Sequence, residues 1–490
     1  MRIIQTNNFN VQIYEKMMIR FLITTVFAAY CFSCIAQGEV TEEFNKLFEK
    51  PDYRNATFGI QVIDAETGKE LFSQNSEKLM IPASVLKIVT TATSLEILGA
   101  DYRFKTRIGY KGNIQNNVLN GDVVIISGGD PTLGSAYFSD RDFLKEWAEK
   151  IREAGIKKIT GNIVLDKSNY EVEELPPTWI WGDIGNYYGA YFDPFTNHDN
   201  LFTITFKSGN AGEQTEIIST TPEIEGLKIE NQVVASENNI DNAFVFGSPF
   251  DKNRVIRGTI PMEKDKFSIK ASMPSPAELF GLMLIKAIRE EGIIFDGVSK
   301  VSSGKAKDFT EIHTHYSPSL EAIIQQLNYE SVNLFAEHLL VQLGSEKNKK
   351  GSREAGIEVI NNFWKELNFE TQNLLMEDGS GLSHFNAVTP SFLNQVLKYM
   401  YHGINSENFV QSLPQAGEGT LKSFGAVDFP ANSLRAKSGS MTRVRCYSGY
   451  IICDSGRTVI FTIMVNHFAG THSQLRSGFE HLLISVKKNF

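Results

Sequence analysis

Ser84 and Lys87 stand three residues apart at the predicted start of a helix. At this spacing two helical side chains share one face. A serine becomes a nucleophile when a nearby base takes its proton, and a lysine can be that base where burial or a neighbouring cation lowers its pKa. Unpaired backbone N–H groups at a helix start can also bind an oxyanion. The pair therefore indicates acyl transfer, although Ser302 and Lys305 match the same spacing by chance.

Two further motifs support this pair. Ser331 and Asn333 begin another predicted helix, and Lys437-Ser438-Gly439 lies on a predicted strand. A glycine in a strand lets another backbone or a ligand approach closely. Each motif has chance matches elsewhere in the chain. The order of the three motifs and their places on helix starts and a strand would rarely arise together by chance.

An α/β scaffold is needed to bring these motifs together. Residues 58–72 have the pattern of a hairpin, and residues 85–97 have apolar side chains at helical spacing. Helical patterns return at 276–291, 319–327, 331–343, 353–367 and 389–401. The chain closes with three predicted strands and a helix, at 433–440, 446–453, 458–466 and 473–487. We expect one α/β (α+β) domain, an antiparallel sheet flanked by helices.

Residues 100–271 have a different sequence pattern from the segments on either side. Short strand-like runs are separated by Gly, Asn and Asp turns, and one amphipathic helix is predicted over residues 140–154. We therefore expect residues 37–99 and 272–490 to form a split catalytic domain. The segment 100–271 would be a large β-rich insertion of two subdomains.

The three motifs resemble those of the penicillin-binding protein and serine β-lactamase superfamily, S-x-x-K, S-x-N and K-[TS]-G. The gap from Ser84 to Ser331 requires a large insertion. Three glycine-containing segments narrow the resemblance to the DacB-type (class C) D-Ala-D-Ala carboxypeptidases/endopeptidases: residues 128–133, 378–383 and 413–421. This resemblance implies the β-lactamase/transpeptidase-like fold.

The resemblance implies five catalytic residues. Ser84 is the acylated nucleophile, and a neutral Lys87 takes its proton. Ser331 and Lys437 pass a proton to the departing amine, while Asn333 positions the substrate amide and Lys87. A cationic Lys437 nearby would lower the pKa of Lys87 and attract an anionic peptide end.

Five further residues are implied in substrate binding. Ser438 and the lysine before it hold the terminal carboxylate, beside Gly439, and the N–H of Ser440 joins that of the nucleophile at the oxyanion. Asp183 resembles the acid that faces the substrate amine in relatives, although a plain turn aspartate fits nearly as well. His384 stands where relatives that bind diaminopimelate often have Arg. A histidine is shorter and only partly charged, so side-chain specificity stays open.

Composition narrows the function classes. The formal net charge of −9 gives no general attraction to nucleic acid phosphates. There is no G-x-S-x-G elbow and no H-E-x-x-H helix. We expect His313 and His315 to be exposed or packed rather than metal ligands, and Trp179 and Trp181 to pack. No metal and no organic cofactor is expected.

Residues 1–36 have the pattern of a secretory signal peptide, a short apolar run behind positive charge that ends in small residues. A lipoprotein signal at Cys34 is an alternative, and translation could begin at Met17 or Met18. We expect a protein secreted across the inner membrane to the periplasm. Cys446 and Cys453 lie on one predicted strand, too far apart for a disulfide.

We therefore expect a serine-type D-Ala-D-Ala carboxypeptidase, endopeptidase or both, acting on peptidoglycan stem peptides. β-Lactam antibiotics would be covalent inhibitors, and no nucleic acid partner is expected. A β-lactamase or esterase on the same scaffold is an alternative, as is a catalytically silent wall-binding module. The sequence leaves open the exo- or endopeptidase preference, the oligomeric state, and any peripheral membrane or wall association.

Overall fold

A five-stranded antiparallel sheet forms the centre of the molecule. The structure is a computed structural model, and it describes residue 18 and residues 37–139, 142–171, 175–306 and 308–490. The strand order is β18 (Leu434–Met441), β19 (Val444–Ile452), β20 (Thr458–Asn466), β1 (Thr57–Asp64) and β2 (Glu70–Gln74). The two ends of the chain thus meet in one sheet, because β1 pairs with β20 along its whole length.

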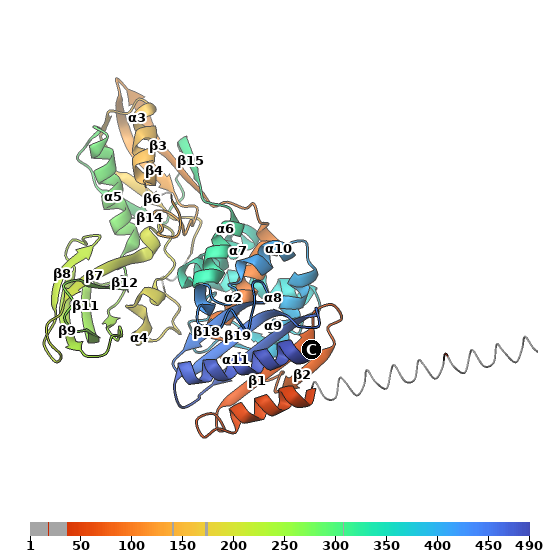
Figure 1. Cartoon of the computed structure of the whole chain (residues 1–490). Helices are drawn as coiled ribbons and strands as arrows, with labels where there is room; N and C mark the ends of the chain where they lie inside the picture. The colour runs from red at the N-terminus through yellow and green to blue at the C-terminus, as the bar shows by residue number, and fades with distance from the viewer. Residues whose placement is uncertain (1–17, 19–36, 140–141, 172–174, 307) are drawn as a thin grey trace, which may run out of the picture.

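Helices cover both faces of this sheet, which gives three layers (Figure 1). A helix through residues 37–48 and α11 (His472–Asn489) pack on one face. The other face carries α2 (Lys87–Leu98), α6 (Leu320–Glu330), α7 (Asn333–Asn348), α8 (Arg353–Glu366), α9 (Pro390–His402) and α10 (Ser406–Ser412). The expected α/β fold with a helix-flanked antiparallel sheet is confirmed.

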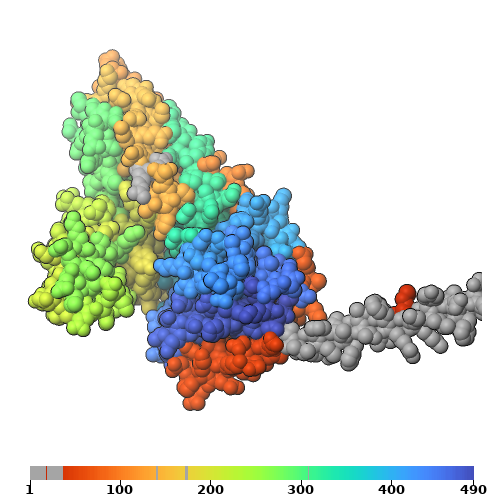
Figure 2. All heavy atoms as spheres, in the orientation of Figure 1, coloured from red at the N-terminus to blue at the C-terminus, as the bar shows by residue number. Residues whose placement is uncertain are grey.

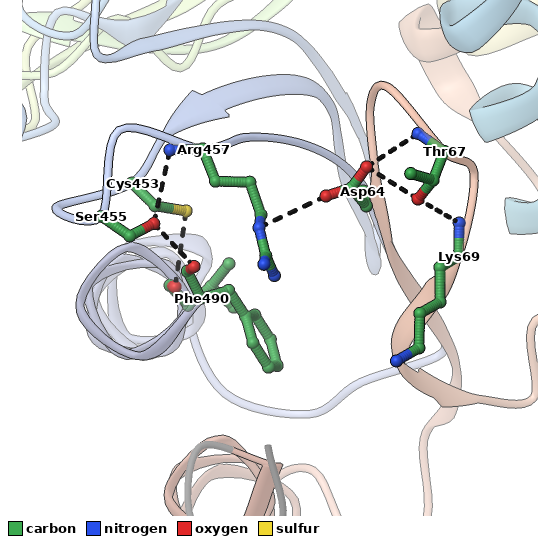
Figure 3. Close-up of polar contacts among 8 residues, drawn as sticks. Asp64, Thr67, Lys69, Cys453, Ser455, Arg457 and Phe490 are labelled. Atoms are coloured by element: carbon green, nitrogen blue, oxygen red, sulfur yellow. Dashed lines mark hydrogen bonds and ion pairs between the residues drawn. The ribbon is translucent and has the colours of Figure 1, made fainter. Parts of the chain in front are cut away.

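Two turns at one edge of the layers are tied to each other. The Oδ1 of Asp64 accepts hydrogen bonds from the backbone N–H and the hydroxyl of Thr67, which closes the β1–β2 turn (Figure 3). The other carboxylate oxygen of Asp64 lies 3.3 Å from Nε of Arg457, just before β20. Ser455 in the β19–β20 turn donates a hydrogen bond to the carbonyl of Phe490. The C-terminus is thereby fixed against the sheet.

The insertion contains a seven-stranded sheet with its own hydrophobic core. Its strands are β3 (Lys105–Gln115), β4 (Val118–Ile126), β5 (Lys158–Ile159), β6 (Ile163–Asp166), β13 (Ile294–Phe295), β14 (Ser299–Ser302) and β15 (Thr310–Tyr316). The helices α3 (Phe143–Glu153) and α5 (Pro276–Glu290) pack in the same core.

This sheet corrects the expected domain boundary. Residues after 271 were assigned to the catalytic domain, but α5 and β13–β15 follow that position and complete the sheet of the insertion. The helical pattern of 276–291 identified a helix but carried no information about its partner. The chain returns to the catalytic domain after β15, where Leu320 begins α6.

A second part of the insertion has a separate core. It holds two three-stranded sheets, made of β7 (Leu201–Lys207), β8 (Glu216–Thr221), β9 (Lys228–Ser236), β10 (Phe244–Phe246), β11 (Asn253–Pro261) and β12 (Phe267–Ser272). In the space-filling view this yellow-green lobe stands beside the blue catalytic part (Figure 2). The short helix α4 (Trp181–Ile184) lies between them in Figure 1.

The expected signal segment, residues 1–36, lies outside the described residues apart from residue 18. Among the described helices, none combines the length and the apolar character that crossing a membrane requires. Cys446 and Cys453 are free and buried, which confirms that they form no disulfide with each other.

Candidate active site

Ser84 lies on a tight turn that leads into a helix. The 3-10 turn η1 (Ala83–Leu86) follows Pro82, and α2 begins at Lys87. The expected helix start thus opens with a turn of 3-10 type. Ala83 has a φ of 48°, which is costly for a residue with a Cβ atom and is a feature that clusters at functional sites.

Lys87 is fully buried and points at the hydroxyl of Ser84. Its Nζ lies 2.8 Å from Ser84 Oγ, 2.6 Å from Asn333 Oδ1 and 2.6 Å from the carbonyl oxygen of Ser380. Burial lowers the pKa of Lys87 to about 7, against the opposing effect of two nearby carboxylates. The amine is therefore held ready to accept the proton of Ser84 near neutral pH.

The two carboxylates belong to Glu337 on α7 and Asp378 in the segment 378–383. Glu337 accepts hydrogen bonds from the N–H groups of Gly379 and Ser380, at 3.1 and 2.8 Å. Burial and the charge of Asp378 raise the pKa of Glu337 to about 7. Glu337 thus holds the stretch of backbone whose carbonyl accepts the hydrogen bond from Lys87.

Asp378 organises the rest of that segment. Its carboxylate accepts hydrogen bonds from the N–H groups of Gly381 and Ser383, at 2.8 and 2.6 Å. The side chains of Asn386 and Trp179 also donate to it, each at 2.8 Å. A fully buried carboxylate with four donors is well satisfied and fixes a loop firmly.

Ser331 and Lys437 form a second hydroxyl–amine pair. Lys437 Nζ donates a hydrogen bond to Ser331 Oγ at 2.8 Å. Ser331 caps the C-terminus of α6 in the left-handed region, with φ 61°, and Lys437 is buried on β18. Burial lowers the pKa of Lys437 well below its usual value, and the positive charges of Lys87 and Arg445 lower it further.

The expected influence of Lys437 on Lys87 is not the leading one. Burial is the main reason why the pKa of Lys87 is low, and the repulsion between the two lysines is a secondary cause of the low pKa of Lys437. Two buried neighbouring amines disfavour a state in which both are protonated. The pair of lysines therefore favours a state with at most one ammonium group.

Asn333 joins the nucleophile region to the insertion. It is the first residue of α7, so its side chain leaves the helix start toward Lys87. Its Nδ2 donates a hydrogen bond to the carbonyl of Tyr188 at 2.7 Å. One side chain thus orients the base and fixes the adjoining segment of the insertion.

Gly439 allows β18 to lie against the nucleophile turn. A Cβ atom at this position would lie 2.7 Å from the carbonyl oxygen of Pro82 and 3.0 Å from the backbone nitrogen of Ser84. Both contacts are to backbone and could not relax cheaply. Glycine here is needed to bring the strand beside Ser84, as the motif predicted.

These groups open into a cavity of about 520 Å³. Of the ten residues expected at the site, seven line it: Ser84, Ser331, Asn333, Ser438, Ser440, Asp183 and His384. Of the other three, Lys87 and Lys437 are fully buried and hydrogen bond to Ser84 and Ser331, and Gly439 lies against the turn that carries Ser84. The structure therefore brings all ten together from distant parts of the chain.

Asp183 from the insertion and His384, directly after the segment 378–383, both line this cavity. Burial raises the pKa of Asp183, while His384 and a hydrogen bond with Tyr188 act in the opposite direction. The Nδ1 of His384 is shielded from solvent and has no hydrogen-bond partner among the described groups.

A family model described as the D-Ala-D-Ala carboxypeptidase 3 (S13) family matches residues 40–483. The chain belongs to this family. It is therefore a serine-type D-Ala-D-Ala carboxypeptidase, and the expected resemblance and enzyme class are confirmed.

Individual proteins similar to this chain are also D-alanyl-D-alanine carboxypeptidases. The D-alanyl-D-alanine carboxypeptidase of Actinomadura sp. (strain R39) is 26% identical over 462 residues, which cover 88% of this chain and 82% of that protein. The carboxypeptidase DacB of Haemophilus influenzae is 24% identical, covering 92% of each chain. The crystal structure of penicillin binding protein 4 (dacB) from H. influenzae matches 92% of this chain and 99% of its own, with a TM-score of 0.79 and 23% identity.

Sequence reasoning missed several groups around the carboxypeptidase site. Glu337 follows Asn333 by one helical turn, a spacing that signals a shared face. Asp378 lies in one of the segments that carry the resemblance, but the sequence analysis assigns it no role. Trp179, which is expected to pack, also donates a hydrogen bond to Asp378. Nothing in the sequence marked Arg445, which lines the cavity, because its contribution depends on how β19 pairs with β18.

Proposed function

We propose that this carboxypeptidase acts on peptidoglycan stem peptides, where it removes the terminal D-Ala and cuts D-Ala–diaminopimelate cross-links through an acyl-enzyme on Ser84. The observation that carries the proposal is the 2.8 Å contact between Ser84 Oγ and the fully buried Nζ of Lys87. An amine with a pKa of about 7 can serve as a base at neutral pH.

In the acylation step Ser84 Oγ attacks the carbonyl carbon of the penultimate D-Ala. The new C–O bond forms while the hydroxyl proton moves to Lys87 Nζ. The negative charge on the carbonyl oxygen is met by the backbone N–H groups of Ser84 and Ser440. Collapse of this intermediate breaks the C–N bond. The proton held by Lys87 is relayed through Ser331 and Lys437 to the departing amine, which leaves Lys87 neutral for the next step.

In the deacylation step a water molecule replaces the amine. Lys87 takes a proton from this water, which attacks the acyl carbon and forms a new C–O bond. The ester bond to Ser84 then breaks, and the proton on Lys87 returns to the serine oxygen. The shortened peptide leaves with a new terminal carboxyl group, and the starting site is restored.

The terminal carboxylate of the peptide would bind at Lys437 and Ser438. A substrate carboxylate beside Lys437 favours its charged form, so binding raises the low pKa of this lysine. Arg445 lines the same cavity and adds a permanent positive charge. Proton uptake by Lys437 would thus accompany substrate binding.

The side chain of the stem peptide would reach Asp183 and His384. Asp183 would accept hydrogen bonds from an amine, and His384 would meet a neighbouring carboxylate. A diaminopimelate side chain carries both groups. Since His384 carries a full charge only when protonated, we propose a weaker grip on this carboxylate than an arginine would give.

β-Lactams would acylate the same serine. The complex of penicillin binding protein 4 (dacB) from H. influenzae with a β-lactam has a TM-score of 0.75 to this chain, and the shared fold supports the proposal. The lifetime of the adduct distinguishes a peptidase from a β-lactamase. We expect a long-lived adduct.

We also propose that the protein works in the periplasm. The support is the pattern of residues 1–36, with a charged lead, an apolar run and small residues. The test is to locate the protein and its N-terminus in fractionated cells. Cytoplasmic protein with residues 1–36 intact would contradict the proposal.

The activity is tested by incubating purified protein with a pentapeptide wall fragment and with a cross-linked dimer, and identifying products by mass. We expect the pentapeptide to lose one D-Ala, and the dimer to separate into monomers. Ser84→Ala should abolish both reactions and the labelling by a fluorescent penicillin. Undiminished labelling of Ser84→Ala would contradict the nucleophile assignment.

A further inference from the structure

We propose that Glu146, His313 and His315 form a binding site for a first-row divalent metal ion, with Zn²⁺ as the best match. The candidate ligand atoms all lie within 4.8 Å of one another. Within the described ranges this is the single group of three histidine, cysteine or acidic side chains that lie so close. It belongs to the insertion and uses no residue of the active site.

Two elements of the insertion bring the three side chains together. His313 and His315 are two apart on β15, the edge strand of the seven-stranded sheet, so both point to the same side. Glu146 lies on α3, which packs against that side of β15. The pairing of β15 with β3 shifts register between Glu311 and His313, and such bulges redirect the side chains that follow.

His313 offers a ring nitrogen that no described residue engages in a hydrogen bond. Its Nε2 is shielded from solvent and has no hydrogen-bond partner in the described part of the chain. Oε1 of Glu146 lies 3.5 Å from this nitrogen. A buried polar atom without a partner carries a desolvation cost, which a bound cation would remove.

His315 is held in place by aromatic side chains of α3. It is 8% exposed, and its ring lies 5.5 Å from that of Trp147 and 6.3 Å from that of Phe143. Packed histidine rings make good metal ligands because little side-chain freedom remains to be lost on binding.

Glu146 supplies the adjustable ligand. Its side chain is 45% exposed and can rotate without disturbing the core. Ligand atoms around a tetrahedral Zn²⁺ are about 3.3 Å apart, so a small rotation of this carboxylate closes the site. Two imidazoles and one carboxylate suit Zn²⁺ and leave a fourth position for water.

We expect the bound metal ion to link α3 to the edge strand β15. β15 continues through Ser317 into α6, whose C-terminal cap is Ser331. A metal ion at His313 and His315 would fix the strand that connects the insertion to this helix. Bound Zn²⁺ therefore stabilises the folded insertion and takes no part in the acyl-transfer steps.

The test uses protein without a histidine tag, stripped of metal and titrated with Co²⁺ and then Zn²⁺. We expect one equivalent of Co²⁺ to give the visible absorption of a tetrahedral site, and Zn²⁺ to displace it. His313→Ala and Glu146→Gln should each weaken binding at least about tenfold. Glu149→Gln, one turn along α3 at a residue that lies 3.8 Å from Lys145, is the matched control and should bind as the wild type does.

Penicillin labelling of each variant shows whether it is folded. Zn²⁺ should raise the thermal midpoint of the wild type and of Glu149→Gln, but not that of the two ligand variants. Equal binding by the wild type and either ligand variant would overturn the proposal. So would the absence of Co²⁺ and Zn²⁺ binding by the wild type.

Discussion

The proposed proton acceptor of this enzyme is a lysine whose burial disfavours its charged form. Lys87 is fully buried, and burial is the main cause of its pKa of about 7. Glu337 and Asp378 act in the opposite direction and keep that pKa from falling further. The balance leaves the amine neutral for much of the time at neutral pH, with a nearby field that stabilises the ammonium formed on acylation.

Replacing Lys87 with Arg tests the need for a titratable amine. An arginine keeps the positive charge but cannot lose its proton, so it cannot accept one from Ser84. We expect the acylation rate of Lys87→Arg to fall by about 10²- to 10⁴-fold, the usual contribution of a general base. Stopped-flow measurement of penicillin acylation gives this rate. A variant with the wild-type rate would contradict the assignment.

The proposed contact of His384 with a substrate carboxylate can be tested by substitution. We expect His384→Arg to raise kcat/KM for a stem peptide with a free diaminopimelate carboxylate about tenfold over an amidated one, since Arg binds carboxylates in a two-pronged way. The two peptides are compared in one competition assay with product masses as the readout. An unchanged ratio would show that the carboxylate does not reach residue 384.

At the scale of elements, a strand, two helix starts and one loop converge on the cavity. β18 can lie against the turn of Ser84 because Gly439 has no side chain. The segment 378–383 is held by Asp378 and Glu337, and its Ser380 carbonyl accepts a hydrogen bond from Lys87. The loop therefore orients the base.

Asp378→Asn tests this role of the loop. The replacement turns one acceptor oxygen into a donor that faces existing N–H donors, so we expect a loss of about 2–3 kcal/mol in the free energy of unfolding. Urea denaturation measures this loss. Glu366→Gln, an exposed position on α8, should change stability by less than about 0.5 kcal/mol. Equal stabilities for the two variants would contradict the account.

The elements of the site were predictable from the sequence, and their environment was not. Apolar spacing identified the helix after Ser84, and the three C-terminal strands were also predicted. The charge environment of Lys87 comes from Glu337 and Asp378, which lie hundreds of residues away along the chain. Local patterns cannot report such contacts, because they arise only when α7 and the loop pack together.

At the scale of the whole molecule, the insertion has two hydrophobic cores that are distinct from those of the catalytic domain. The sequence predicted a β-rich insertion made of short strands separated by turns. The sequence did not predict where the chain returns to the catalytic domain. The helix α5 and the strands β13–β15 have ordinary helical and strand patterns, and such patterns do not show which sheet an element joins. Only long-range pairing, as between β15 and β3, defines the boundary.

The second lobe of the insertion and the catalytic domain have separate cores, so a substitution in one core should leave the other part folded. Ile204 is fully buried in the core of the second lobe, so Ile204→Ala should destabilise that lobe by about 2–5 kcal/mol. We expect penicillin acylation of Ser84 to stay within about twofold, since among the described residues the core of the second lobe shares no side chain with the two cores of the catalytic domain. Ile218→Ala, 48% exposed on the same sheet, is the control. Limited proteolysis measures the stability of the lobe, and the acylation rate measures the activity of the catalytic domain. A large loss of acylation by a folded Ile204→Ala variant would show that the two parts are not independent.

The central claim is that neutral Lys87 activates Ser84, and the pH dependence of penicillin acylation tests it most directly. The proton acceptor is active when deprotonated, so the rate should be level above the pKa of about 7 and fall tenfold for each pH unit below it. A rate that does not change with pH, or that rises only near the ordinary pKa of a lysine, would contradict the account.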